Sequence, residues 1–202
     1  MITALEELTR LKEGNQRFVS GTRRVEPSIS HAERNELASG QEPFAIILGC
    51  SDSRVPAEIV FDQGLGDLFV IRVAGNIVAP SQVGSVEFAA EQFKSRLVVV
   101  MGHTHCGAVR ATVDEMQRPT GEQSRNVKSI VNRIRPSVES FRDTDLWTQT
   151  EALISHATRA NVRASVNQLS HGSQILEQLI ENRELSIVGA EYSLETGVVE
   201  FF

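Results

Sequence analysis

Two short segments carry the residues of this sequence that are best suited to chemistry. The first is Gly49-Cys50-Ser51-Asp52-Ser53-Arg54-Val55-Pro56, and the second is Gly102-His103-Thr104-His105-Cys106-Gly107. The 202-residue chain contains only two cysteines, and each of them lies in one of these segments beside a carboxylate or a histidine. Thiolate and neutral imidazole are the ligands that zinc prefers in proteins. The two segments therefore predict a metal site.

Each segment follows an apolar run that ends at a glycine, residues 44–48 before the first and 97–101 before the second. Runs of this length are typical of strands buried on both faces of a parallel sheet. The carboxyl ends of such strands meet at one edge of an open α/β sheet, where ligands bind. We therefore expect the side chains of both segments to converge at that edge.

The spacing of the ligands favours a catalytic site over a structural one. A structural zinc finger takes its ligands from local pairs, and this sequence contains no Cys-x-x-Cys. Cys50, His103 and Cys106 would leave a fourth position of the tetrahedron open, as catalytic zinc sites do. A helix is expected to begin at Cys106, and its positive partial charge favours the thiolate there.

Composition excludes several classes of function. The net charge is −6 and the pI is about 5.4, which argues against nucleic acid as a partner because phosphate binding needs a basic face. No apolar run approaches the length needed to cross a membrane, and the first residues lack the basic start and apolar core of a signal peptide. We therefore expect a cytoplasmic protein whose cysteines are reduced.

The whole chain is predicted to form a single α/β domain, with an N-terminal helical arm over 1–40 and an α/β core over 41–202. This alternation of strands and helices is typical of a mostly parallel central sheet flanked by helices. Pro136 is expected to end or kink the helix before it. Strands are expected at 44–49, 67–73, 97–101, 185–192 and 197–202, and helices at 3–18, 56–61, 81–93, 106–116, 124–135, 148–169 and 173–183.

Taken together, the two segments resemble the signature motifs of the β-class carbonic anhydrases. Cys50-Ser51-Asp52-Ser53-Arg54 and His103-Thr104-His105-Cys106-Gly107 match those motifs in sequence, order and separation. The intervening Gly66-Asp67-Leu68-Phe69-Val70 and the turn Ala74-Gly75-Asn76 are similar too. The resemblance is close over about 40–110 and looser elsewhere. Paired motifs of this kind are far more specific than one short pattern.

The resemblance implies that Cys50, His103 and Cys106 hold Zn²⁺. It also implies reversible hydration of CO2 to bicarbonate and a proton by zinc-bound hydroxide, in a homodimer or a dimer of dimers. Two thiolates would make zinc a weaker Lewis acid than three imidazoles do. We therefore expect turnover to rise with pH above neutrality, and a rate that is flat or falling between neutral and mildly alkaline pH would contradict this.

Asp52 and Arg54 are predicted to form a catalytic dyad. Two residues apart on extended backbone, they share a side and allow a carboxylate–guanidinium pair, in which Arg54 lowers the pKa of Asp52. An ionised carboxylate only accepts hydrogen bonds, so Asp52 would orient the hydroxide towards CO2. In the family, the equivalent aspartate also ligates zinc in a resting state, and the sequence leaves open which state prevails.

The resemblance also suggests a substrate pocket. Gln41, Phe69, Phe88 and Gly107 occupy places where plant-type members have substrate-pocket residues, with Phe88 in place of a tyrosine. Taken singly, the two phenylalanines are explained equally well as core residues. Regulated members have an inhibitory bicarbonate pocket built by a tryptophan, an arginine and a tyrosine. Here Ile47 stands for the tryptophan, while Arg72 and Tyr192 resemble the other two, so the plant-like pocket is favoured.

Three other functions remain open. Related enzymes hydrolyse CS2 or COS with the same zinc hydroxide, and a closed zinc-binding protein would use Asp52 as a permanent fourth ligand. A dithiol redox protein using Cys50 and Cys106 is disfavoured because no Cys-x-x-Cys is present. Of the other histidines, His105 is expected to support or pack beside the site rather than to bind metal, and ordinary roles are expected for His31, His156 and His171.

Overall fold

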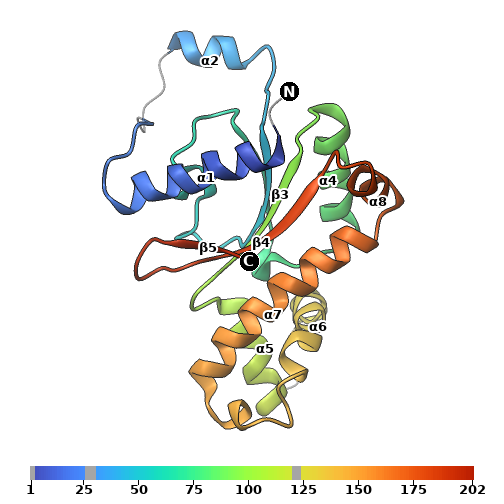
Figure 1. Cartoon of the computed structure of the whole chain (residues 1–202). Helices are drawn as coiled ribbons and strands as arrows, with labels where there is room; N and C mark the ends of the chain where they lie inside the picture. Colours follow the sequence, from blue (N-terminus) through green and yellow to red (C-terminus); the bar gives the residue numbers. More distant parts are fainter. Residues whose placement is uncertain (1–2, 26–30, 120–123) are drawn as a thin grey trace.

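The computed structural model describes residues 3–25, 31–119 and 124–202, and it has a five-stranded sheet in the order β2-β1-β3-β4-β5. Strands β1 to β4 are parallel, and only β5 runs antiparallel, against β4. The prediction of a mostly parallel sheet flanked by helices is therefore confirmed (Figure 1). The elements are α1 (Ala4–Val19), α2 (His31–Leu37), β1 (Ala45–Gly49), α3 (Ala57–Val60), β2 (Leu68–Arg72), the 3-10 turn η1 (Ala74–Asn76), α4 (Pro80–Gln92), β3 (Leu97–His103), α5 (Gly107–Gln117), α6 (Arg125–Glu139), the 3-10 turn η2 (Asp145–Thr148), α7 (Thr150–His171), α8 (Gln174–Glu181), β4 (Ser186–Tyr192) and β5 (Val199–Phe201).

Helices cover both faces of the sheet because side chains alternate between the faces along each strand. In β1, Ile47 joins the core cluster that contains Leu11 of α1, whereas Ile46 joins the cluster that contains residues of α4, α7 and α8. A third cluster unites α5, α6 and one end of α7 in a helical lobe beyond the carboxyl ends of β1 and β3 (Figure 1). Cys50 and Cys106 belong to this third cluster, so the predicted metal site lies where the sheet meets the lobe.

The N-terminal helix packs on its own sheet. Thr3 caps α1 in a capping box with Glu6, and the fully buried Leu11 enters the core. Asn15 donates to the carbonyl groups of Val60 and Gly197 and accepts from the N–H of Val199, which ties α1 to both α3 and the last hairpin. Residues 26–30 of the predicted arm lie outside the described part of the chain.

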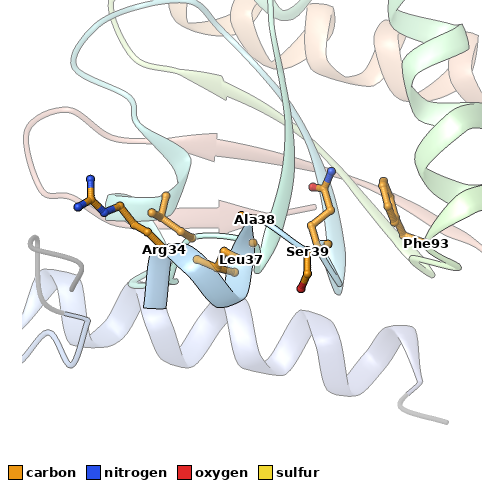
Figure 2. A pocket seen from close by; sticks show the side chains of 9 residues that line it. Arg34, Leu37, Ala38, Ser39 and Phe93 are labelled. Carbon is orange, nitrogen blue, oxygen red and sulfur yellow. The ribbon is translucent and has the colours of Figure 1, made fainter. Parts of the chain in front are cut away.

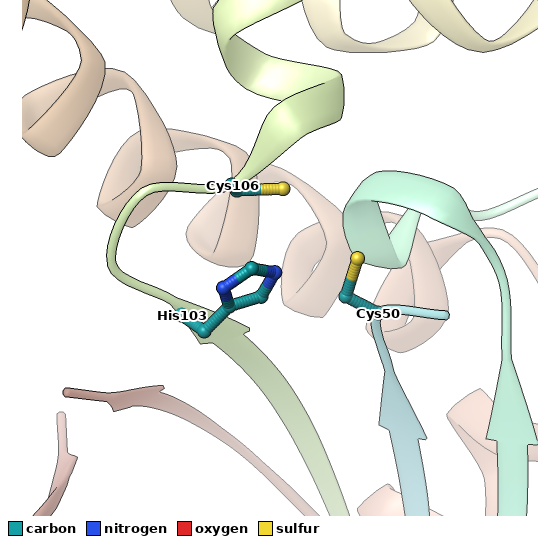
Figure 3. A group of neighbouring side chains, drawn as sticks. All are labelled: Cys50, His103 and Cys106. Atoms are coloured by element: carbon teal, nitrogen blue, oxygen red, sulfur yellow. The ribbon is translucent and has the colours of Figure 1, made fainter. Parts of the chain in front are cut away.

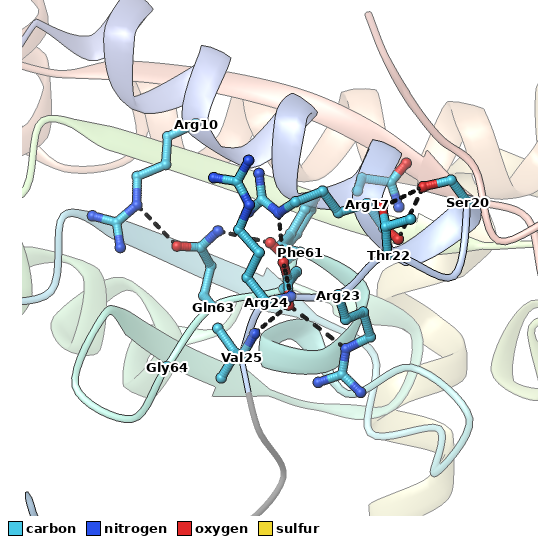
Figure 4. Close-up of polar contacts among 12 residues, drawn as sticks. Arg10, Arg17, Ser20, Thr22, Arg23, Arg24, Val25, Phe61, Gln63 and Gly64 are labelled. Atoms are coloured by element: carbon cyan, nitrogen blue, oxygen red, sulfur yellow. Dashed lines mark hydrogen bonds and ion pairs between the residues drawn. The ribbon is translucent and has the colours of Figure 1, made fainter.

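A buried carboxylate fixes the segment after α1. Asp62 is fully buried at its side chain and accepts from Arg17 Nε at 2.6 Å. It also accepts from the backbone N–H groups of Arg24 and Val25. Figure 4 labels these two donor residues beside Arg17 and Arg23 and draws the contacts as dashed lines. The pKa of Asp62 is lowered because these donors outweigh the effect of burial, which acts in the opposite direction. The carboxylate therefore anchors the arm to the loop after α3.

Two predicted boundaries were wrong. Gly102 was expected to stop the third strand, but β3 continues to His103. A Cβ at Gly102 would lie 2.7 Å from Val162 Cγ2, so this glycine lets α7 approach the strand rather than ending it. Pro136 was expected to end or kink α6, and the predicted end is wrong, because the helix runs on to Glu139 and Ser137 and Val138 beyond the proline are buried. Over the described residues, no helix is long and apolar enough to cross a membrane.

Candidate metal centre

Three predicted ligands meet at the carboxyl edge of the sheet. Cys50 follows the last residue of β1, His103 is the last residue of β3, and Cys106 is the N-cap residue of α5. Strands β1 and β3 are neighbours, with Gly49 paired to Met101, so their ends deliver these side chains to one place. Figure 3 shows the two sulfurs and the imidazole ring pointing towards a common space.

The geometry of this cluster suits a metal ion. The ligand atoms of Cys50, His103 and Cys106 all lie within 4.8 Å of one another, and all three residues are buried. In a tetrahedral site with zinc–sulfur and zinc–nitrogen bonds of about 2.3 and 2.0 Å, neighbouring ligand atoms stand roughly 3.5–3.8 Å apart. The side chains therefore need only small adjustments to share one ion.

The imidazole of His103 supplies an independent test of this fit. The ring is fully buried, and its Nδ1 lies 2.8 Å from the carbonyl oxygen of Thr104, to which it donates a hydrogen. The lone pair is then on Nε2, which is buried and has no hydrogen-bond partner among the described residues. A buried polar atom without a partner is costly. A metal ion bound at Nε2 explains this arrangement, because ligating histidines commonly donate their other N–H to a carbonyl.

The two thiols influence each other strongly. A hydrogen bond from Cys106, assisted by the N–H of Gly75, lowers the pKa of Cys50 to about 4 despite its burial. The same contact raises the pKa of Cys106. The N–H groups at the start of α5 act on Cys106 in the direction predicted, but the neighbouring Cys50 sulfur outweighs them. Without a metal ion, the contact between the two sulfurs therefore favours ionisation of one thiol and opposes ionisation of both.

Asp52 and Arg54 pair beside the cluster, as predicted. Arg54 Nε donates to Asp52 Oδ1 at 2.9 Å, and Arg54 Nη2 donates to Oδ2 at 2.7 Å. The predicted extended backbone was wrong, because residues 53 and 54 form a turn in which the Arg54 N–H also donates to Oδ1 at 3.0 Å. The guanidinium of Arg54 lowers the pKa of Asp52, so this carboxylate is ionised at neutral pH. Asp52 Oδ2 lies 3.8 Å from His103 Nε2, at the rim of the cluster.

Arg72 holds the backbone of the first ligand segment. It is the last residue of β2, paired with Gly49 of β1. Its Nε donates to the carbonyl of Cys50 at 3.0 Å, and its Nη2 donates to the carbonyl of Asp52 at 2.5 Å. From the sequence, Arg72 was expected only as a possible member of an inhibitory bicarbonate pocket. Of the other two positions of that pocket, Ile47 and Tyr192 are buried in the core cluster on the α1 face of the sheet.

The four predicted pocket residues do not lie together. Gly107, the first residue of α5, follows Cys106, and a Cβ there would meet nothing within 4 Å. Phe69 is paired with Ile46, four residues before Cys50, which places it about 13 Å away along the sheet. Phe88 packs against Phe69 with ring centroids 6.2 Å apart. Of these four residues, only Gly107 adjoins the cluster of candidate ligands in the same chain.

Gln41 lies near the opposite edge of the sheet, where it lines a groove of about 710 Å³ (Figure 2). The groove walls come from the end of α2 and the segment after it, from Leu65 and Gly66, and from Phe93. Phe93 also contacts the rings of Phe69 and Phe88, each at 5.8 Å between centroids. Three of the predicted pocket residues therefore share one surface region, away from the metal cluster of the same chain.

The remaining histidines are engaged outside the cluster. His105 Nε2 lies 2.5 Å from Glu195 Oε1 in the turn between β4 and β5, and His105 is not part of the metal-binding cluster, so its supporting role stays a prediction. His31 contacts Arg34, His156 packs on Phe141, and His171 Nδ1 lies near a carbonyl of α7.

Sequence reasoning missed the contribution of α7 to this site. Asn161 and Ser165 are buried on the face of α7 that meets η1, and they donate to the carbonyl groups of Gly75 and Asn76. A signal was present in the sequence, since polar residues recur at 158, 161 and 165, which share one face of the helix with the apolar Ala157 and Val162.

Comparisons with known proteins agree with this geometry. The sequence model of a family described as "Carbonic anhydrase" matches residues 45–199. "Carbonic anhydrase 2" of Mycobacterium tuberculosis is 41% identical over 190 residues, covering 93% of this chain and 87% of that protein. The carbonic anhydrase of Mycolicibacterium smegmatis is 42% identical over 193 residues, covering 94% and 89%.

Solved structures give the same relationship at the level of the fold. The structure of the β-carbonic anhydrase CcaA superposes with a TM-score of 0.74 at 27% identity, covering 97% of this chain and 87% of that one. A tetrameric β-carbonic anhydrase from Sordaria macrospora superposes with a TM-score of 0.74 at 23% identity, covering 84% and 85%.

Proposed function

The chain belongs to the β-carbonic anhydrase family, and on that premise we propose that it catalyses the reversible hydration of CO2 to bicarbonate and a proton at a zinc ion. The observation that carries this proposal is the buried cluster of Cys50, His103 and Cys106, in which the Nε2 atom of His103 has no hydrogen-bond partner in the described chain. When bound there, zinc supplies a Lewis acid that lowers the pKa of a coordinated water molecule.

The ligands differ in what they contribute. The two thiolates balance the charge of a dication, while His103 contributes a neutral nitrogen whose orientation is fixed by its bond to the Thr104 carbonyl. The backbone that carries Cys50 is held by Arg72, which donates to the carbonyl groups of Cys50 and Asp52. This set of donors fits zinc in ligand type, number and burial.

In this proposal Asp52 orients the reacting oxygen, and Arg54 keeps Asp52 in place. The carboxylate is ionised, so it accepts a hydrogen bond and cannot donate one. Both of its oxygens already accept from Arg54, which holds the carboxylate at the rim of the cluster. A closed site with Asp52 as fourth ligand would require these bonds to Arg54 to rearrange, so the arrangement with Asp52 on Arg54 supports the catalytic alternative.

The pocket for CO2 is proposed to need a second copy of the chain. Gly107 adjoins the cluster, whereas Gln41, Phe69 and Phe88 lie on a different part of the same chain, where Phe88 is 52% exposed. A homodimer, or a dimer of dimers, would let one chain present these residues to the metal centre of its partner. The assembly of the Sordaria macrospora relative, described as tetrameric, is consistent with this proposal.

The first experiment measures zinc content and the rate of CO2 hydration on one preparation. We expect close to one zinc per chain and hydration that a chelator abolishes and added zinc restores. The same preparation is assayed with COS and CS2. Activity on the sulfur substrates alone, or a preparation without zinc that forms a reversible Cys50–Cys106 disulfide, would overturn the proposal.

The dyad is tested by Asp52→Ala and Arg54→Gln, with Arg142→Gln as a control at an exposed arginine that pairs only with Glu139 in the described chain. Losing an oriented group beside a metal commonly costs about 10- to 100-fold in activity. We expect kcat/KM to fall by roughly that factor in both dyad variants while zinc content stays near that of the parent. An Asp52→Ala enzyme that keeps its zinc and is as active as the parent would refute the role of Asp52.

A further inference from the structure

A backbone amide points at the sulfur of the first metal ligand. The N–H of Gly75 donates to Cys50 Sγ at 3.3 Å, in the buried region where η1 meets the cluster. An N–H donor draws electron density from a thiolate and fixes its direction, which are two of the means by which proteins tune sulfur ligands. The position of this amide therefore bears on any metal bound by Cys50.

The backbone conformation of η1 explains why residue 75 is a glycine, but it does not explain what stabilises the turn. Gly75 has φ +70°, in the left-handed region that favours glycine. A Cβ there would lie 2.6 Å from Ile134 Cδ1 and 3.0 Å from the Cβ of Ala108. Asn76, the next residue, also has positive φ, at +42°. Two consecutive residues in this region need support from their surroundings.

Helix α7 gives that support through two side chains. Asn161 Nδ2 donates to the carbonyl of Gly75 at 2.8 Å, and Ser165 Oγ donates to the carbonyl of Asn76 at 3.0 Å. Asn161 is 2% exposed and Ser165 is 4% exposed, so water does not compete well for either bond. The two residues are one helical turn apart, and they hold both carbonyl groups of the turn from one side.

One residue, Gly75, connects α7 to the metal ligand through two adjacent peptide units. The Gly75 residue that accepts from Asn161 through its carbonyl donates to Cys50 through its N–H. If the carbonyl loses its buried donor, the turn relaxes and the amide no longer aims at the sulfur. Helix α7 also packs on β3, whose last residue is His103, so it is a rigid support shared by two ligands.

We propose that Asn161 and Ser165 are positioning residues, which hold the Gly75 amide on the Cys50 sulfur and thereby strengthen metal binding and moderate electron donation from that thiolate. This inference rests on the proposed function, because it requires that Cys50 binds a metal ion. Asn161 and Ser165 lie outside the two sequence motifs that carry the ligands, so the inference assigns a new role to this face of α7.

The test compares Asn161→Ala and Ser165→Ala with Thr158→Val. Thr158 lies on the same helix, is equally buried and donates to Ile154 within the helix, so it makes a matched control. Zinc affinity is measured by competition with a chromophoric chelator. The thiolate-to-metal charge-transfer band is measured after replacement of zinc by Co²⁺, and thermal unfolding checks that each variant is folded.

We expect Asn161→Ala to lower zinc affinity about 10-fold or more, Ser165→Ala to lower it less, and Thr158→Val to leave it within about twofold. The charge-transfer band should move to longer wavelength in the first two variants, because a sulfur without its hydrogen bond gives up an electron more easily. A loss of packing alone would not move this band in that direction. Should Asn161→Ala not fold, the band and the affinity of Ser165→Ala decide the question.

The inference is overturned if folded Asn161→Ala and Ser165→Ala match the parent in both affinity and band position, or if Thr158→Val shifts both as much as they do. A parent protein that binds neither zinc nor Co²⁺ overturns the proposed function as well. The two failures can be told apart, because the inference about Asn161 and Ser165 is tested only if the parent protein binds metal.

Discussion

Substitution of Gly102 tests whether the close approach of α7 to the sheet requires a glycine at this position. In Gly102→Ala, the new Cβ would stand 2.7 Å from Val162 Cγ2 and 3.3 Å from Thr158 Cγ2. Valine is stiff about χ1 and Val162 is fully buried, so the clash cannot be relieved by a simple side-chain rotation. Overpacking of this kind costs about 1–3 kcal/mol of unfolding free energy. For a chain of this size, that cost lowers Tm by roughly 2–12 °C.

A double-mutant cycle separates this clash from other effects. Val162→Ala alone should cost about 1–3 kcal/mol, because it leaves a cavity. In the double variant, the methyl group introduced at position 102 occupies space that the valine vacated, so the total cost should be smaller than the sum by about 1–2 kcal/mol. Urea and thermal unfolding measure all four proteins.

Gly84→Ala is the matched control, since Gly84 lies within α4 and a Cβ there would meet nothing within 4 Å. It should stabilise the chain by about 0.5–1 kcal/mol, the usual gain from replacing a glycine inside a helix. The reasoning is refuted if Gly102→Ala is as stable as the parent, or if the two substitutions at 102 and 162 are additive within about 0.5 kcal/mol.

Two further predictions concern buried carboxylates. Burial raises the pKa of Glu7 to about 7, so the folded chain holds a proton that the unfolded chain releases near pH 4.5, and stability should fall as pH rises between these values. At pH 8, Glu7→Gln should therefore raise the free energy of unfolding by on the order of 1–3 kcal/mol, and urea unfolding should no longer show this pH dependence. The exposed Glu13→Gln is the control and should show neither effect. Equal curves of unfolding free energy against pH for Glu7→Gln and the parent would contradict this. Asp62 is the opposite case, because its lowered pKa gives stability that is present above about pH 4 and is lost as pH falls through the folded pKa. Asp62→Ala leaves Arg17 without its buried partner and should cost about 3–5 kcal/mol at pH 7, and a loss below about 1 kcal/mol would show that the anchor is dispensable.

The cluster of candidate metal ligands could be predicted because the chemistry of its residues is local. Cys50, His103 and Cys106 are the residue types that zinc prefers, and Cys50 and His103 stand at the ends of runs that are buried on both faces in the structure. Parallel strands bring such ends to one edge whatever the details of packing. The pairing of Asp52 with Arg54 was also predicted, although it forms on a turn, since short spacing allows the contact in either backbone conformation.

The sequence misled where a residue type has two structural uses. Gly102 ends an apolar run, which favours a strand end, but its missing side chain serves the approach of α7. Pro136 favours a helix end, yet buried residues on both sides of it keep α6 intact. In each case packing between distant elements outweighed the local preference, and no window of sequence contains both partners.

By itself the sequence determined the three candidate metal ligands, the parallel sheet and the carboxylate–guanidinium pair, because these depend on residue type and on short spacing. Only the tertiary structure decided that Gly75 aims its amide at Cys50, that Asn161 supports that turn from 86 positions away, and that Gln41 and Phe88 lie apart from the candidate metal ligands. Hydrogen bonds between distant segments need a direction as well as a partner, and direction is set only when the helices have packed on the sheet.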